Sequence, residues 1–177
     1  SRGDRRPRLG RYLVEGGQGT LEGTWMPDDK LRDRDRSLLR YDAFQNISSH
    51  WQARANLNWI SDSRYYEDFS NSLDGLSQTS AYSAIGVYGR GQGWDAGVTA
   101  DHWQLADFTL TEEALPFSRL PRAYLNREQR LAGLLLGGIG AEAVRFEHEA
   151  YDAGSRIDLK PWISLPLEGN SWFLRPT

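Results

Sequence analysis

The sequence has no cysteine and a single methionine among 177 residues. The lack of cysteine excludes a disulfide framework and a thiolate metal site within this stretch. Long apolar runs are also missing. The longest candidate, residues 131–139, holds three glycines and falls well short of the roughly 20 residues that a membrane helix needs. Ser1 to Arg8 is rich in arginine and has no apolar core, so we expect no signal peptide there.

A strong charge of either sign is absent as well. The 21 basic residues nearly balance 24 acidic ones, the two signs are interleaved, and the formal net charge is −3. Nucleic-acid-binding domains usually carry a clustered basic patch. We therefore expect no nucleic-acid partner.

Catalytic and metal-binding patterns are lacking too. His50, His102 and His148 fall on separate expected strands without the spacing of metal ligands. No Gly-x-Ser-x-Gly motif occurs, and the glycine-rich run at 86–93 lacks the Lys-Ser/Thr of a phosphate loop, so these glycines predict bends or a close approach to a plug. Adjacent carboxylates, as at 67–68 and 112–113, are usually solvated in loops. We expect no enzyme activity, no metal and no cofactor.

The residues that are abundant point to long amphipathic strands. There are 7 Trp, 8 Tyr and 18 Gly. Residues 51–59, Trp-Gln-Ala-Arg-Ala-Asn-Leu-Asn-Trp, alternate apolar and polar without a break, which is the period of a strand with a different solvent on each face. At about 3.3 Å per residue and a tilt near 45°, Trp51 and Trp59 would be separated by roughly 19 Å across a membrane. A barrel's apolar band is about 25 Å tall with aromatic rims, so the spacing favours a membrane strand.

This alternation assigns side chains to two faces. Residues 94–101 and 39–43 repeat it. We expect one set of residues to face lipid: Trp51, Leu57, Trp59, Trp94 and Val98. We expect a second set to face the lumen or a plug: Arg40, Asp42, Arg54, Asn56 and Asn58.

The predicted fold is all-β, an antiparallel up-and-down transmembrane β-barrel of which this chain supplies about ten strands. Those strands are expected at 8–15, 18–26, 37–47, 50–60, 78–90, 93–105, 121–130, 135–148, 155–166 and 171–176. Tight turns and longer loops alternate between them, and the longer loops are predicted at 27–36, 61–77, 106–120 and 149–154. Outer-membrane barrels put their long loops outside the cell, so 61–77 is expected to be extracellular.

Two other functions fit these residues. A general outer-membrane porin or channel would line a water-filled constriction with facing rings of Arg and Asp or Glu. A soluble periplasmic β-domain that binds lipid or sugar would bury the tryptophans in a core.

Four blocks of sequence resemble those of the LptD family, the lipopolysaccharide-assembly barrel proteins, and they occur in that family's order. They are Gly-Thr-Leu-Glu-Gly-Thr-Trp-Met-Pro-Asp-Asp-Lys at 19–30, Ile-Ser-Asp-Ser-Arg-Tyr-Tyr-Glu-Asp-Phe at 60–69, Leu-Pro at 120–121, and Arg-Ile-Asp-Leu-Lys-Pro-Trp-Ile-Ser-Leu-Pro at 156–166. The second block is the most specific.

The resemblance implies an outer-membrane location in a Gram-negative bacterium and a role in inserting lipopolysaccharide into the outer leaflet. Residues 1–177 are expected to form an early-to-middle part of a larger barrel, whose periplasmic jelly roll and remaining strands lie outside this chain. The partners it implies are a plug lipoprotein similar to LptE, a periplasmic bridge protein similar to LptA that docks on the jelly roll, lipopolysaccharide and outer-membrane lipid. Three arginines in an acid-rich loop, Arg32, Arg34 and Arg36, could contact lipopolysaccharide phosphates, which guanidinium groups bind bidentately.

Overall fold

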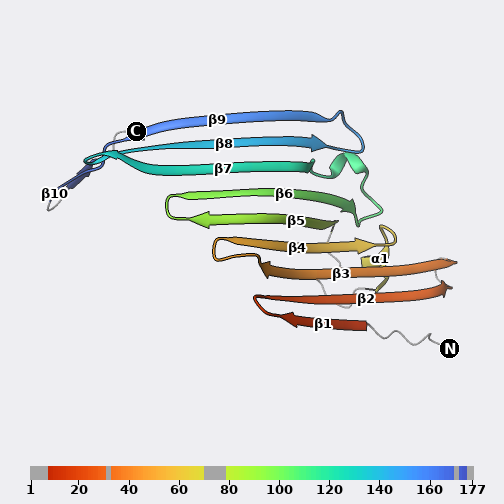
Figure 1. The fold of residues 1–177 in the computed structure, drawn as a ribbon. Coiled ribbons are helices and arrows are strands. Elements are labelled where there is room, and N and C mark those ends of the chain that lie inside the picture. The colour runs from red at the N-terminus through yellow and green to blue at the C-terminus, as the bar shows by residue number, and fades with distance from the viewer. Residues whose placement is uncertain (1–7, 31–32, 70–78, 170–171, 175–177) are drawn as a thin grey trace.

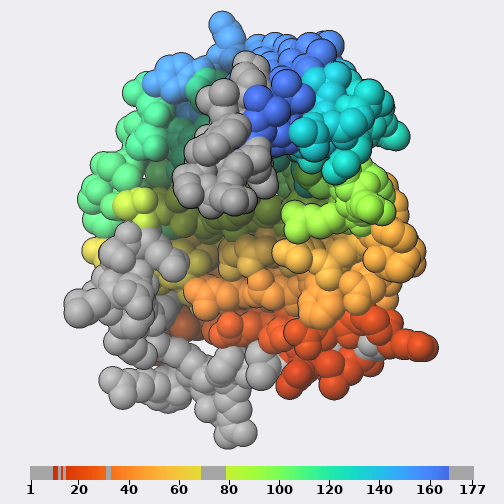
Figure 2. All heavy atoms as spheres, turned by 90° about the vertical axis from the view of Figure 1, so that its left-hand side faces the viewer, coloured from red at the N-terminus to blue at the C-terminus, as the bar shows by residue number. Residues whose placement is uncertain are grey.

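The computed structural model describes residues 8–30, 33–69, 79–169 and 172–174. Nine antiparallel strands form one sheet in strict chain order, as a meander (Figure 1). Their bounds are β1 Arg8–Val14, β2 Gly17–Asp29, β3 Arg34–Asn46, β4 Trp51–Ile60, β5 Ser80–Gly91, β6 Trp94–Leu105, β7 Ser118–Ala132, β8 Leu135–Glu147 and β9 Gly154–Ser164. Seen from the left-hand side of Figure 1, the colours follow one another from red at the bottom to blue at the top (Figure 2). The all-β, up-and-down prediction is confirmed.

The two ends of the sheet differ. At one end, on the left in Figure 1, β1–β2, β3–β4, β5–β6 and β7–β8 are joined by short turns. Three of these turns place a glycine at positive φ, Gly16 at 73°, Gly93 at 71° and Gly133 at 52°, a region that other residues rarely adopt. The other end carries the long connections. We call these two ends the tight-turn end and the long-loop end.

The sheet is open among the described residues. Strand β1 pairs with β2, and β9 pairs with β8, while the further edge of each lacks a strand partner within the described part of the chain. The strand expected at 171–176 is described only in part, as a strand that does not join this sheet. Its described part, β11 Trp172–Leu174, pairs with an unexpected strand, β10 Leu167–Gly169, in a separate two-stranded sheet.

Two short helices lie in loops where the sequence predicted irregular chain. They are α1 Tyr65–Phe69 and a 3₁₀ helix at Glu112–Ala114. In the part of the chain that is described, no helix is both long enough and apolar enough to cross a membrane.

The compact buried cluster is small and lies at the long-loop end. Its members are Leu38, Ile60, Tyr65, Tyr66, Ala81 and Ala106, drawn from β3, β4, α1, β5 and the residue after β6. Most of the sheet therefore has two accessible faces instead of one covered core.

Strands β4 and β5 separate before they reach the long-loop end. Their paired register runs from Trp51–Gly89 only to Asn56–Ala84. Beyond it, side chains replace ladder hydrogen bonds: the Ser83 hydroxyl bridges the N–H and C=O of Asn58, and the Gln104 amide bridges those of Ile60. These bonds satisfy backbone groups that would otherwise lie unpaired near the buried cluster.

Glycines in the strands make room for aromatic rings. A Cβ on Gly138 would lie 2.4 Å from the Trp162 ring, and one on Gly97 would lie 2.7 Å from that of Tyr124. In both cases the ring closest to the added Cβ belongs to the residue opposite that glycine on the neighbouring strand.

Candidate functional site: a two-faced wall with an inward-folded loop

The register places the two predicted sets of side chains on opposite faces of the sheet. Arg40 is opposite Asn58 and Asp42 is opposite Asn56 across β3 and β4. Because side chains alternate along a strand, Arg54 shares their face. We call this the polar face. We call the other face the apolar face. There Trp51 of β4 is opposite Gly89 of β5, which is in turn opposite Ala96 of β6, and Val98 of β6 is opposite Val87 of β5.

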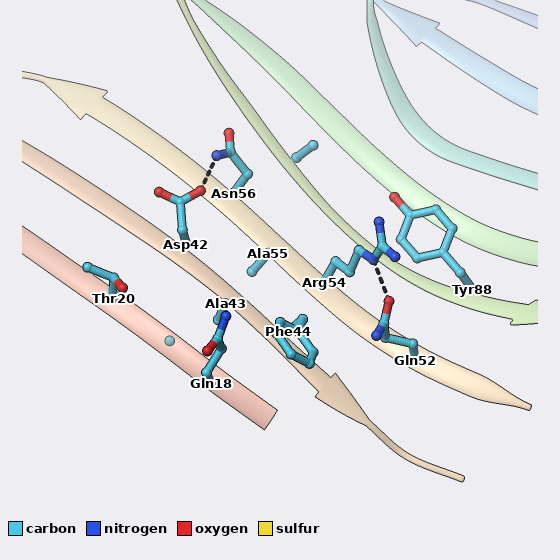
Figure 3. Close-up of a pocket in the computed structure, with 12 residues that line it drawn as sticks. Gln18, Thr20, Asp42, Ala43, Phe44, Gln52, Arg54, Ala55, Asn56 and Tyr88 are labelled. Carbon is cyan, nitrogen blue, oxygen red and sulfur yellow. Dashed lines mark hydrogen bonds between the residues drawn. The ribbon is translucent and has the colours of Figure 1, made fainter. Parts of the chain in front are cut away.

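The polar face is hollowed over β2 to β5. A pocket of about 530 Å³ is lined there by side chains that include Gln18, Asp42, Arg54, Asn56 and Tyr88 (Figure 3). Asn56 donates a hydrogen bond to Asp42, and the Arg54 guanidinium lies 5.8 Å from the centre of the Tyr88 ring. The pocket is therefore lined by hydrogen-bonding groups of several strands.

Charged side chains on the polar face pair with one another between strands. Glu142 of β8 accepts from Arg122 of β7 at 2.6 Å and from Arg156 of β9 at 2.5 Å. On β6, Asp101 lies 2.5 Å from Arg119 of β7. The cationic and anionic groups thus alternate along this face and neutralise one another locally.

The apolar face is exposed over its length. Val98 is 55% exposed, Trp59 49% and Ile157 84%, although these residues come from three different strands. Soluble domains rarely leave a contiguous apolar surface of this extent uncovered. Such a face fits an apolar solvent.

Aromatic side chains mark both ends of the apolar face. At the tight-turn end, the rings of Trp51 and Trp94 lie 5.7 Å apart, and Trp94 also stacks on His50. At the long-loop end, Trp25 and Trp59 are both largely exposed. This arrangement is typical of the aromatic girdles of membrane barrels.

At the long-loop end, the chain after β4 turns back onto the polar face. Its anchor is Arg36, whose guanidinium is fully buried. Arg36 pairs with Asp62 through two hydrogen bonds of 2.9 Å, donated by Nε and Nη2. Its Nη1 donates to Asp68 at 2.6 Å and to Asp29 at 3.3 Å. The side chain of Arg36 also lies 5.6 Å from the Tyr65 ring centre. We call Arg36, Asp29, Asp62 and Asp68 the arginine clamp.

The clamp favours the ionised form of Asp62. Burial opposes ionisation of Asp62, but hydrogen bonds from Arg36 and Ser61 outweigh that effect and hold its pKa below the ordinary value. For Tyr65, burial raises the pKa of the phenol, while a hydrogen bond with Thr24 acts in the opposite direction. The loop therefore packs onto the sheet with a charged but well-paired group beneath it.

Arg32, Arg34 and Arg36 do not form a group. Arg32 lies outside the described residues. Arg36 is not available to a phosphate, because three carboxylates surround its buried guanidinium. Arg34 is about half exposed and lies 3.3 Å from Asp62, so among the described members of this group it is the one with an accessible guanidinium.

The sequence analysis missed the clamp, although signals for it were present. Asp62 and Asp68 belong to the most specific resemblance block, and Asp29 belongs to the first block. Alternation along β3 places Arg36 on the same face as Arg40 and Asp42. The pairing itself depends on the fold of the loop, which local periodicity does not encode.

The histidines take part in separate local contacts. The His102 ring lies 3.3 Å from the Ser118 hydroxyl, and His148 contacts the Leu115 carbonyl at 2.9 Å. Within the described ranges, no group of three or more His, Cys, Asp or Glu side chains is placed to hold a metal ion.

An antiparallel meander with one exposed apolar face, one charged face and aromatic ends defines a wall segment of a membrane-type β-barrel. The family model for LPS transport system D matches residues 34–177. The chain belongs to the LptD family. It is 44% identical to the LPS-assembly protein LptD of Xanthomonas euvesicatoria pv. vesicatoria and 41% identical to that of Xylella fastidiosa. Each match covers 94% of this chain and 24% of the relative, so the chain spans about a quarter of the length of these curated relatives.

Proposed function

We propose that this chain forms part of the wall of an outer-membrane barrel that assembles lipopolysaccharide in the outer leaflet of a Gram-negative bacterium. The observation that carries the proposal is the two-faced sheet of a chain in the LptD family. The apolar face would contact outer-membrane lipid through Trp51, Leu57, Trp59, Trp94 and Val98. The polar face would line the lumen, where a plug lipoprotein similar to LptE packs against Arg40, Asp42, Arg54, Asn56 and Asn58.

The remaining parts of the machine would come from the rest of the protein. An unpaired strand edge in lipid leaves backbone groups without hydrogen-bond partners, which is costly. Strands outside this chain would therefore pair with β1 and β9 to close the barrel. A jelly roll, also outside this chain, would receive lipopolysaccharide from a bridge protein similar to LptA.

The loop held by the arginine clamp has a place in this function. Long loops of outer-membrane barrels usually lie outside the cell, so the long-loop end would be extracellular. Folding α1 onto the polar face would then narrow the outer mouth of the lumen and leave Arg34 exposed toward lipopolysaccharide phosphates. The tight-turn end would face the periplasm.

The two other candidate functions have less support. A soluble β-domain does not account for the exposed apolar face, of which Ile157 and Val98 are examples. A porin constriction separates positive and negative rings, whereas Glu142 pairs with Arg122 and Arg156 on the same face.

Adjacent residues of β5 allow a sharp test of the two faces. A photo-crosslinking amino acid is placed at Tyr88 on the polar face or, as the matched control, at Val87 on the apolar face of the full-length protein in cells. We expect an adduct with the plug lipoprotein from position 88 and none from position 87. Equal plug adducts from both positions would contradict the proposed faces.

The assembly activity has a separate readout. Depleting the full-length protein should stop newly made lipopolysaccharide from reaching the cell surface, as surface labelling would measure. Normal arrival of lipopolysaccharide in depleted cells would refute the proposed function.

A further inference from the structure

A groove interrupts the apolar face near the tight-turn end of β7, β8 and β9. Its volume is about 800 Å³, and its lining includes Leu131, Ile139, Pro161 and Ile163. Leu131 lies at an irregularity in the register of β7, between Arg130 and Ala132. Gly137 lies directly beneath Leu131, because a Cβ there would come within 2.6 Å of its side chain. The groove is thus an elongated apolar depression between neighbouring strands.

One of the residues that line this groove is a positively charged side chain, Arg127. Arg127 lines it, is exposed, and lies on the apolar face opposite Trp94 on one side and Ile139 on the other. Its guanidinium donates a 3.4 Å hydrogen bond to the side-chain oxygen of Gln129. Among the described residues, no carboxylate lies within ion-pair distance of Arg127.

A second arginine on the same face differs from Arg127 because it has an ion-pair partner. Arg145 of β8 shares the face by alternation, but it pairs with Glu147 at 2.8 Å near the long-loop end. A guanidinium against lipid is costly unless an anion accompanies it. Arg127 therefore needs an anion, and the described residues around it offer none.

We propose that this groove binds a glycerophospholipid of the periplasmic leaflet. The lipid phosphate accepts hydrogen bonds from Arg127, with Gln129 beside it, and an acyl chain lies along Leu131, Ile139 and Ile163. Arginine suits phosphate because its planar fork donates two parallel hydrogen bonds. The apolar lining suits an acyl chain. The groove lies toward the short turns, which face the periplasm in outer-membrane barrels, so a phospholipid is favoured over lipopolysaccharide.

The test uses the full-length protein with its plug, purified in a mild detergent and titrated with phosphatidylglycerol while native mass spectrometry counts bound lipids. Arg127→Gln should weaken binding of the tightest lipid by about tenfold or more, in line with the loss of a charge-assisted hydrogen bond. Arg127→Lys should retain part of the affinity. The matched control, Arg145→Gln, should leave binding unchanged.

Two results would overturn the inference: equal lipid affinity of the Arg127→Gln variant and the unmodified protein, or a preference of the Arg127 site for lipopolysaccharide over phosphatidylglycerol. Heat-modifiable migration on gels shows that each variant is folded. The inference rests on the proposed lipid contact of the apolar face, which a spin label at Leu159 tests by itself. If lipid-soluble oxygen reaches that label while Arg127→Gln leaves the lipid affinity unchanged, only the phospholipid site is refuted. If oxygen does not reach the label, the proposed lipid-facing surface is refuted as well.

Discussion

The arginine clamp predicts that one substitution releases the loop after β4. Replacing Arg36 by Met removes the cation and leaves Asp29, Asp62 and Asp68 around an apolar side chain. Their side chains are 10%, 7% and 8% exposed, so little water can replace the lost partner. Breaking a buried ion pair by removing one partner typically costs about 3–5 kcal/mol.

The cost should appear locally, because the strands on either side have their own ladders of hydrogen bonds. We expect the barrel of the full-length Arg36→Met protein to form, while the segment around α1 detaches from the polar face. Limited proteolysis in intact membranes should then cut within residues 61–69 much faster than in the unmodified protein. Mass spectrometry would locate the cut.

The same carboxylate provides a matched control. Arg34 also contacts Asp62, but it is half exposed and its guanidinium lies 3.3 Å from that carboxylate. Exposed ion pairs contribute about 1 kcal/mol or less, so Arg34→Gln should leave the cleavage rate nearly unchanged. Equal protection of the loop in the Arg36→Met and Arg34→Gln proteins would refute the assigned role of the clamp.

Three further predictions follow from other parts of the wall. Leu57→Arg should cost about 2–4 kcal/mol of folding free energy near the bilayer midplane, measured by denaturant titration in vesicles, whereas Asn56→Arg on the polar face should cost much less; equal losses would contradict the faces. Gln104→Leu should cost about 1–3 kcal/mol in the same assay, because it leaves the N–H and C=O of Ile60 without partners; an unchanged free energy would argue against this bridge. The Asp62 pKa is lowered in the folded protein, so its contribution should be fully present above the unfolded value of about 3.9 and be lost as the pH falls through the folded pKa. Loop cleavage by an acid-active protease should therefore rise only at strongly acidic pH, and a rise already near pH 6 would contradict the assignment.

The strands and their faces could be predicted because alternation with period two is a local property of the chain. The unbroken pattern at 51–59 corresponds to β4, Trp51–Ile60, and the other eight strands of the main sheet lie within a few residues of their predicted bounds. The largest shifts are in β2, β3 and β7, where the strands extend further into predicted loops.

The inward fold of the loop could not be predicted in the same way. Helix α1 has only five residues, too few for a periodic signal, and its position depends on Arg36 from another strand. The three arginines were interpreted as possible phosphate contacts because guanidinium groups bind phosphate bidentately. Burial of Arg36 by carboxylates far along the chain is a tertiary effect.

The groove on β7 to β9 also required the structure. The sequence shows glycines at 133, 137 and 138, but their use depends on which neighbouring side chain covers them. The register of β7 and β8 brings Leu131 over Gly137 and sets Arg127 beside the groove. A pattern in one strand does not contain that information.

The central claim is that one face of this sheet contacts lipid and the other contacts the lumen. A nitroxide scan along β4 of the full-length protein in native membranes tests it directly, with oxygen as the lipid-soluble quencher and a nickel chelate as the aqueous one. The account predicts strict alternation from 51 to 59: oxygen should reach labels at odd positions such as Leu57, and even positions such as Asn56 should be shielded from it, with the nickel chelate reaching them wherever the plug leaves water. Uniform access along the strand, or alternation with the opposite phase, would contradict the account.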